Sequence, residues 1–414
     1  MNNMVILHFV PSLNAVRKSA FLRYKTALFE AMAKRAETHV LTLDATDISY
    51  GNVIVESHPS SYVNSCRIQR SFAKTLSAHK PDIVHIHAVW NIPAYKLFCE
   101  CQKLDIPTVI TADHQLDKWH MRHHYWNKKF LQLPIYQKRM LSHSSALHFV
   151  TRQEQSYFKT FNELPWVKSS QCLNEKSEVV EAFNISREMS AQDMSDNLLS
   201  LYKKVIDSTP FSRMDEKEQH IEDLLLAIGY NNGNFLVSTE DISLVESINE
   251  TSWRRILLHS SDEGIIDYVK AGAKAINAAM PVIDIERINR FPPKTKNHDI
   301  KIKQVARKLK SDKTLPLFEQ ELCILITTVL HKIKYGTVHR SDFARICKML
   351  KSNEYDEELV NAQMHKLGLS NDVARIFQII KERYNLSDGF MFTDPLDDKK
   401  TEILRRKLYK SKIQ

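Results

Sequence analysis

The chain has 414 residues, with 58 Lys or Arg against 49 Asp or Glu, which gives a formal net charge of +9 at pH 7. Its hydrophobic fraction of 43% is ordinary for a soluble protein, and its length allows two or three domains with cores of their own. The N-terminal segment has no apolar run of about 18 residues, which argues against a signal peptide or a membrane span and predicts a cytoplasmic protein.

Short apolar runs alternate with amphipathic segments over residues 1–165. The runs predict strands near residues 5–10, 39–43, 53–55, 83–89, 107–111 and 146–150. The segments between them predict helices near residues 21–36, 71–79 and 94–103, and a long one that ends near Leu141. Apolar strands separated by helices are typical of a parallel sheet covered on both faces. The predicted fold class is therefore α/β, with a Rossmann-like, doubly wound parallel sheet in the N-terminal domain.

The apolar spacing becomes mostly helical after Pro165, which predicts a divergent, mostly helical C-terminal region. We expect three parts. These are a Rossmann-like domain over residues 1–165, a mixed and mainly helical region over residues 166–300, and a helical region over residues 301–414.

Local signals refine the two later parts. Residues 234–239 predict a strand, and residues 254–276 predict a strand, a turn near Gly264 and a helix. The polar, proline-rich residues 289–299 predict a linker. In the last part, the helices are expected to break near Gly336, Gly368 and Gly389.

Glycine is scarce, with eight in the chain and none between Asn52 and Ile228. A loop that cradles phosphate needs glycines, because its backbone approaches the anion closely and adopts positive φ angles. The chain has neither a dinucleotide fingerprint nor a P-loop, which argues against dehydrogenases and kinases.

Two stretches place polar residues where predicted strands end, "PDIVHIHAVW" at 81–90 and "TADHQLDKW" at 111–119. Open parallel sheets bind ligands beyond the carboxyl ends of their strands. Alternation sends His85 and His87 to one face of the sheet, and the strand delivers His87 toward the ligand edge. The alternative is that both are core histidines with satisfied hydrogen bonds.

Basic and aromatic residues are concentrated between Lys118 and Gln153, where no acid occurs. Such a surface attracts phosphate, whether of nucleic acid, lipid headgroups or a diphosphate substrate. On a membrane, the residues expected to face the lipid are Trp126, Lys128, Lys129 and Phe130. The competing interpretation is a helix that packs its aromatic residues into the core.

Residues 81–90, 106–119 and 144–158 occur in an order and spacing that resemble the family 4 glycosyltransferases. These are retaining enzymes of the two-domain GT-B type, which transfer sugars from nucleotide diphosphate donors. The resemblance covers residues 1–165. Within it, Gln115 stands where the family usually has a glycine.

The resemblance implies roles for particular residues. His114 would lie close to the anomeric carbon of the donor sugar, where it orients or stabilises charge, and Asp113 would flank it. The expected acceptor contacts are His87, Trp90, Asp117 and Trp119. The family's usual donor-site signatures are missing from the second half, and the nearest candidates for donor contacts are Arg254, Arg255, Asp262 and Glu263.

We therefore expect a retaining hexosyltransferase that moves a sugar from a nucleotide-sugar donor to a lipid-linked or oligosaccharide acceptor. The setting would be bacterial surface or capsular polysaccharide synthesis, peripheral to the inner face of the plasma membrane. No cofactor and no metal are expected, because His120 and His124 lack the intervening catalytic Glu of a zinc helix.

Two alternatives remain open from the sequence. The chain could be a non-catalytic glycosyltransferase-like subunit that binds or assembles, because the donor-site glutamate pair is missing. Nucleic-acid binding is the less favoured alternative, since residues 335–352 and 364–384 have the length and breaks of helix-turn-helix units.

Overall fold

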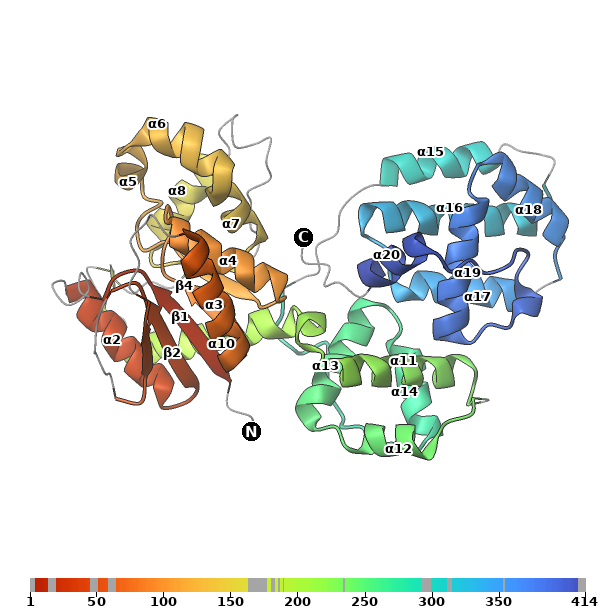
Figure 1. Ribbon diagram of the computed structural model, residues 1–414, viewed down its shortest axis with the longest axis horizontal. Coiled ribbons are helices and arrows are strands. Elements are labelled where there is room, and N and C mark those ends of the chain that lie inside the picture. Colours follow the sequence, from red (N-terminus) through yellow and green to blue (C-terminus); the bar gives the residue numbers. More distant parts are fainter. Residues whose placement is uncertain are drawn as a thin grey trace. The chain divides into compact units, whose positions relative to one another are not determined.

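The fold is described from a computed structural model of the chain (Figure 1). The described residues are 4–13, 20–44, 51–58, 65–162, 177–179, 183–184, 187–188, 190–233, 235–291, 299–310, 315–352 and 354–408. They form two compact units. The first unit runs to Arg213 and includes Asn289–Phe291, and the second runs from Met214 to Ile288 and continues after the linker.

A seven-stranded sheet forms the centre of the first unit, in the order β3-β2-β1-β4-β5-β6-β7. Every neighbouring pair of strands is parallel. The strands are β1 (Val5–Val10), β2 (Glu37–Thr42), β3 (Ile54–Ser57), β4 (Ile83–Ile86), β5 (Thr108–Thr111), β6 (Ala146–Phe149) and β7 (Ser177–Val179). The predicted parallel sheet is confirmed.

Helices cover both faces of this sheet, which makes it doubly wound. On one face, α2 (Ala20–Ala33) and α10 (Ala191–Asp207) pack against β1, β4 and β5. On the other face, α3 (Ser65–His79) and α4 (Ile92–Lys103) pack against the same strands, as Figure 1 shows for α3 and α4. Phe72 and Phe98 lie fully buried on that second face.

Shorter elements complete the first unit. The segment predicted as one long helix is interrupted by a turn at His123 and His124, where His124 has a φ of +54°. Around Pro134 the backbone widens into a π-helical segment, η1. The elements are α5 (Lys118–Arg122), α6 (Tyr125–Asn127), η1 (Lys128–Gln137), α7 (Lys138–His143), α8 (Arg152–Asn162), the pair β8 (Phe183–Asn184) and β9 (Arg187–Glu188), and η2 (Pro210–Arg213).

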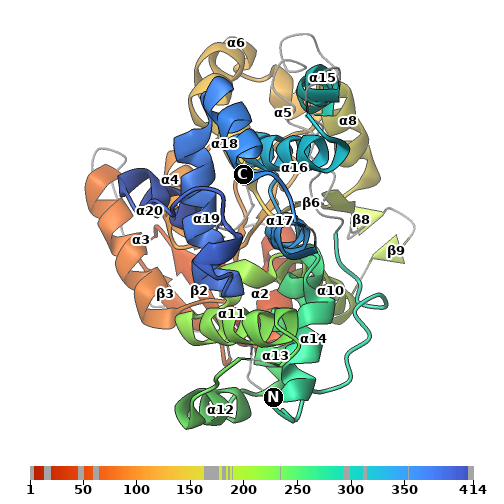
Figure 2. The same ribbon diagram turned by 90° about the vertical axis from the view of Figure 1, so that its right-hand side faces the viewer.

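All secondary-structure elements among the described residues of the second unit are helices (Figure 2, green to blue). This confirms the predicted mostly helical C-terminal region. Its elements are α11 (Glu216–Tyr230), α12 (Thr239–Glu246), α13 (Glu250–Asp262), α14 (Ile266–Ala275), α15 (Asp299–Lys310), α16 (Leu317–Tyr335), α17 (Arg340–Ser352), α18 (Glu357–Lys366), α19 (Ser370–Tyr384), η3 (Asp388–Phe390) and α20 (Lys399–Leu408).

Both strands predicted in this unit are wrong. Residues 235–238 form irregular chain in which Leu236 is 99% exposed, and the Ser238 side chain caps α12 by accepting from the Asp241 amide at 3.0 Å. Residues 254–262 belong to α13, which the Asn249 side chain caps. Trp253, Ile256 and Leu257 are buried there at helical spacing, so the short apolar run was a helix face.

The turn and the helix breaks that were predicted at glycines agree with the structure. Gly264 has a φ of +67° and separates α13 from α14, as expected for a turn. Gly336 and Gly368 also have φ angles of +67° and follow the ends of α16 and α18, and Gly389 lies in η3. Of the predicted linker at 289–299, residues 292–298 lie outside the described part of the chain.

No helix in the described part of the chain combines the length and apolar character that a membrane span requires.

Two glycines allow α11 and α14 to pack side by side (Figures 1 and 2). A Cβ atom at Gly229 would lie 1.9 Å from the carbonyl oxygen of Tyr268, and one at Gly272 would lie 2.0 Å from that of Leu225. Both obstacles are backbone atoms, which cannot rotate away. The helix contact therefore requires glycine at both positions.

We expect Gly272→Ala to destabilise the second unit by about 3 kcal/mol, because overpacking against backbone forces the helices apart. Gly389→Ala is the matched control, since a Cβ there has nothing within 4 Å. Calorimetric unfolding should show a transition of the second unit lowered by about 6–12 °C in the first variant only. Equal transitions in the two variants would contradict the packing argument.

Candidate functional site

A row of polar side chains crosses the sheet on the face that α2 and α10 cover. His8 of β1 lies opposite His85 of β4, and Thr111 of β5 lies opposite His148 of β6. His87 follows two residues after His85 and joins the same face. All five side chains are buried. We call His8, His85, His87 and His148, with Thr111, the histidine row.

His85 is fully hydrogen-bonded within this row. Its Nδ1 lies 2.5 Å from the hydroxyl of Tyr202 on α10, and its Nε2 lies 2.5 Å from Oγ1 of Thr111. The Thr111 oxygen also lies 2.8 Å from Nδ1 of His148. His85 is therefore a core histidine with satisfied hydrogen bonds, which was the alternative interpretation of its position.

Burial keeps the histidine row uncharged. It lowers the pKa of His8 to about 3 and that of His148 to about 4, and the nearby Lys25 ammonium acts in the same direction. The pKa values of His85 and His87 also lie well below the usual value, through burial first and neighbouring side chains second. At neutral pH each ring is therefore a neutral imidazole.

The turn after β5 holds the two predicted catalytic residues in an unusual backbone conformation. Asp113 and His114 are consecutive residues with φ angles of +50° and +65°, a left-handed conformation that costs energy for side chains other than glycine. Asp113 forms an ion pair with Lys25 of α2, and both side chains are at least 90% buried. Burial raises the pKa of Asp113, and the Lys25 ammonium opposes that rise. The ion pair therefore anchors the turn to α2.

The His114 side chain lies nearer the surface, with 34% of its area exposed. Its Nδ1 lies 3.0 Å from Oδ2 of Asp117. An ionised carboxylate only accepts hydrogen bonds, so this contact favours a proton on Nδ1 and leaves Nε2 as an acceptor. His114 therefore has a defined orientation at the carboxyl edge of the sheet.

A pocket of about 380 Å³ lies at the same edge, beyond the ends of β1, β4 and β5. We call it the edge pocket. Gln115, the residue after His114, belongs to its wall. Its lining consists of Pro11, Ala88, Val89, Trp90, Asn91, Gln115, His120 and Lys128. Concave sites of this size, with apolar walls and a few polar groups, are typical of small-molecule binding.

Trp90 is fixed in this wall by three contacts. Its backbone amide donates to Oε1 of the buried Gln137 at 2.7 Å, and its indole Nε1 donates to the carbonyl of Gln115 at 3.1 Å. The Lys128 ammonium lies 5.6 Å from the centre of the ring and donates to the carbonyl of His120. Trp90 itself has a φ of +56°, which is a strained backbone conformation for a residue other than glycine.

The predicted acceptor residues divide between two places. Trp90 lines the edge pocket, Asp117 holds His114, and Trp119 is 70% exposed with its ring 5.9 Å from that of His123. His87 is only 5% exposed and lines a separate cavity of about 20 Å³ beneath the turn, together with Lys25 and Asp113. His87 therefore does not open into the edge pocket.

The four residues predicted to face a membrane also differ from one another. Trp126 and Phe130 are 67% and 60% exposed, and their parallel rings stack at 5.5 Å. Lys128 is half-buried in the edge pocket, and burial lowers its pKa. The Lys129 side chain lies outside the described part of the structure.

The four predicted donor residues lie in the second unit, with Arg254 and Arg255 in the middle of α13, Asp262 at its end and Glu263 directly after it. Nη1 of Arg255 donates to both carboxylate oxygens of Glu218 at 3.0 and 3.1 Å. Glu263 is buried and accepts from the backbone amide of Arg340 at 2.8 Å. Arg254 and Asp262 are half-buried on the same helix.

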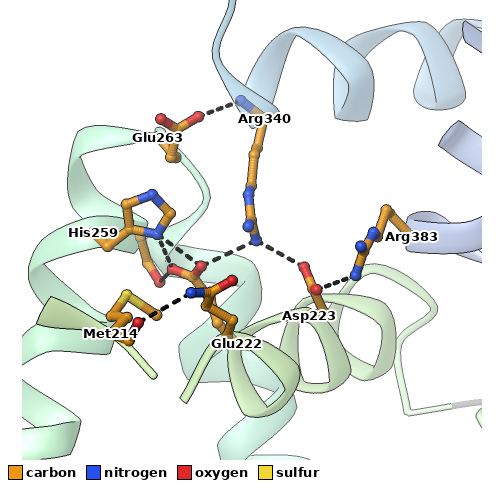
Figure 3. Close-up of polar contacts among 9 residues, drawn as sticks. Met214, Glu222, Asp223, His259, Glu263, Arg340 and Arg383 are labelled. Carbon is orange, nitrogen blue, oxygen red and sulfur yellow. Dashed lines mark hydrogen bonds and ion pairs between the residues drawn. The ribbon is translucent and has the colours of Figure 1, made fainter. Parts of the chain in front are cut away.

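Arg340 connects Glu263 to a buried ionic network (Figure 3). Its guanidinium lies 3.0 Å from the carboxylate of Glu222 and 2.9 Å from that of Asp223, which also pairs with Arg383. His259 contacts the Glu222 carboxylate at 2.7 Å. Several bases of the predicted helix-turn-helix segments therefore hold the helices of the second unit together.

Sequence reasoning missed Lys25, Gln137 and Glu154. Each comes from an element distant in the sequence, and no local motif marks it. Glu154 of α8 lies under the turn, where its Oε1 is 3.4 Å from the backbone amide of Leu116. Burial raises the pKa of Glu154 to about 8, with the Asp117 carboxylate acting in the same direction. The side chain is therefore protonated at neutral pH.

This pKa predicts a pH dependence of stability. Because the folded-state pKa exceeds the usual value of 4.5, the contribution of Glu154 to stability is complete below that value and is lost as the pH rises toward about 8. Glu154→Gln keeps an uncharged side chain of the same shape at every pH. We expect the Tm of the wild type to fall relative to that of the variant between pH 5 and about pH 8. Parallel curves would show that Glu154 is ionised in the folded protein.

Comparison with known proteins gives one family match. Residues 23–165 match the family model of the glycosyl transferase 4-like domain. That range contains the turn with Asp113 and His114, and most of the lining of the edge pocket. Comparisons with curated proteins and with solved structures each give no match.

Proposed function

Residues 23–165 are a glycosyl transferase 4-like domain, and from this premise we propose that the chain is a retaining glycosyltransferase that binds its acceptor in the edge pocket. It moves a sugar from a nucleotide-sugar donor to a lipid-linked or oligosaccharide acceptor, in the synthesis of a bacterial surface or capsular polysaccharide. The observation that carries the proposal is the strained turn, which places His114 one residue from the wall of a 380 Å³ pocket.

The proposal gives His114 an electrostatic role with Asp117. The Nε2 lone pair of His114 accepts a hydrogen bond from a sugar hydroxyl, and the Asp117 carboxylate stabilises positive charge that develops near the imidazole. Asp113 acts through position, because its ion pair with Lys25 fixes the turn. No side chain is required as a nucleophile in this scheme.

Trp90 and Gln115 shape the acceptor side. The Gln115 carbonyl fixes the indole of Trp90, so its polar edge is occupied and its face lines the pocket. An apolar wall with a few polar groups suits a sugar, which has both kinds of surface. The Lys128 ammonium adds a positive charge at the wall, which supports an acceptor that carries phosphate. Trp119 extends this side toward solvent.

A lipid-linked acceptor would bring the protein to a membrane surface. Large exposed apolar side chains gather in the segment from α5 to η1, namely Trp119, Trp126, Phe130, Leu131 and Ile135. Arg122 and Arg139, in or next to the same segment, are exposed. Aromatic rings together with bases favour the interface of an anionic bilayer. We propose that this segment docks on the inner face of the plasma membrane.

We expect His114→Ala to abolish sugar transfer and to leave the Tm nearly unchanged, because a half-exposed residue at the sheet edge contributes little to packing. The assay incubates the full chain with a panel of labelled nucleotide sugars and a polyprenyl-phosphate sugar acceptor. His365→Ala is the matched control, since His365 is exposed on α18 of the second unit. Activity of the His114 variant within a few-fold of wild type would remove His114 from the site.

Membrane docking is tested with a Trp126→Ser, Phe130→Ser double variant. A fully buried aromatic ring contributes roughly 1.5–3 kcal/mol, so losing both should weaken binding to anionic vesicles by at least about tenfold. Leu236→Ser is the control, because Leu236 is 99% exposed in the other unit. A substitution that reverses the charge of Lys128 is unsuitable for this test, because it would also change the lining of the edge pocket. Equal flotation of wild type and double variant would contradict docking through this segment.

A second candidate function is a non-catalytic subunit that binds the acceptor without transferring sugar. The observation that favours it is the absence of any strand among the described residues of the second unit, where two-domain transferases carry their donor domain. Acceptor binding by the wild type, with no transfer from any donor of the panel, would support this candidate over the first.

A further inference from the structure

The histidine row contains ring nitrogens that hydrogen bonding within the described residues does not account for. Nε2 of His8, Nδ1 of His87 and Nε2 of His148 are all buried without a hydrogen-bond partner. A buried polar atom that loses its partner costs about 1–3 kcal/mol. Three such atoms in one row of a core are unusual, and they call for an occupant of the row.

The rings of His8 and His87 are in direct contact. Nδ1 of His8 is 3.0 Å from Nε2 of His87. If one donates to the other, one ring keeps an orphaned N–H and the other an orphaned lone pair, whichever tautomers are chosen. A cation bound by Nδ1 of His8 and Nε2 of His87 would replace this contact with two metal–nitrogen bonds, and each ring would then carry its proton on its other nitrogen.

A third imidazole completes the arrangement. The rings of His85 and His87 stack with centres 4.0 Å apart, and His8 lies 5.4 Å from His85 by ring centres. His8, His85 and His87 can each offer one ring nitrogen such that all three lie within 4.8 Å of one another. Two ligands of a tetrahedral Zn²⁺ with bonds of about 2.0–2.1 Å lie roughly 3.3 Å apart. The separations within this group exceed that value by at most about 1.5 Å.

We propose that His8, His85 and His87 bind a divalent transition-metal ion of the Zn²⁺ class in the core of the first unit. Neutral imidazole is the ligand such ions favour. His85 gives one ring nitrogen to the ion and keeps its other hydrogen bond, to Thr111 or Tyr202, as metal-binding histidines usually do. This inference is independent of the proposed sugar transfer.

The surroundings of the three rings allow such an ion. The three rings are buried together on one face of the sheet, and each imidazole can offer a lone pair on one nitrogen. The adjoining cavity of about 20 Å³, lined by His85 and His87, has room for one water as a fourth ligand. Lys25 and Asp113 line the same cavity as an ion pair, so the Asp113 carboxylate offsets part of the positive charge of Lys25 there.

Motif spacing could not find this site. Local patterns such as paired histidines on one helix gave the expectation that no metal is bound. The ligands proposed here come from β1 and β4, and only the register of those parallel strands brings His8 opposite His85.

The test uses the full chain without a polyhistidine tag, stripped with a chelator and titrated with Co²⁺. We expect about one equivalent to give the visible d–d absorption of a four- or five-coordinate ion, and Zn²⁺ to displace it. His87→Gln should weaken Co²⁺ binding about tenfold or more. A wild-type spectrum that stays that of hydrated Co²⁺ would overturn the proposal, and this result does not depend on whether a variant folds.

Two further variants locate the ion. His79→Ala removes a member of a second group, His39, Glu56 and His79, whose ligand atoms also lie within 4.8 Å. The proposal requires His79→Ala to bind Co²⁺ as the wild type does, and loss of binding there would overturn it. His8→Gln removes the proposed ligand on β1, so it should weaken Co²⁺ binding as His87→Gln does. Co²⁺ binding by a folded His8→Gln variant that equals that of the wild type would place the ion elsewhere.

Discussion

The ion pair between Lys25 and Asp113 joins a helix that covers the sheet to the turn that carries the candidate site residues. It connects α2, which covers one face of the sheet, to the turn that follows β5. Asp113 and His114 both have left-handed backbone conformations, which a chain adopts only where its surroundings compensate the cost. A buried charge pair supplies that compensation, because either charge alone would be expensive inside the core. His114 is thereby held at the sheet edge.

Parallel register then determines what lies around this turn. The carboxyl ends of β1, β4 and β5 meet at one edge, and the edge pocket lies there with Trp90 in its wall. Beneath the edge, the same register aligns the histidine row across the sheet. The edge pocket above is open and partly polar, and the histidine row below it is buried. Both follow from one arrangement of strands.

Periodicity in the sequence was enough to predict the sheet and the edge at which the candidate site residues lie. Apolar strands separated by helices allow few topologies, and residues that end such strands must lie at the edge, as Trp90 and His114 do. Periodicity could not predict the contacts between elements that are distant in the sequence. Lys25 meets Asp113, and Gln137 meets Trp90, only because the strands bring their elements together. The strand predicted within residues 254–262 was wrong for another reason, because a short apolar run fits a buried strand and a helix face equally well.

The second unit marks the limit of the family resemblance. Its described residues form a helical assembly held by close contact of α11 with α14 and by the network around Arg340. The central claim is that this chain nevertheless transfers sugar. The most direct measurement is a thermal-shift titration of the full chain with a panel of nucleotide diphosphate sugars, with and without acceptor. Sugar transfer predicts that at least one donor raises the Tm, because a ligand that binds only the folded state stabilises it. A panel in which no donor shifts the Tm, even with acceptor present, would contradict the claim.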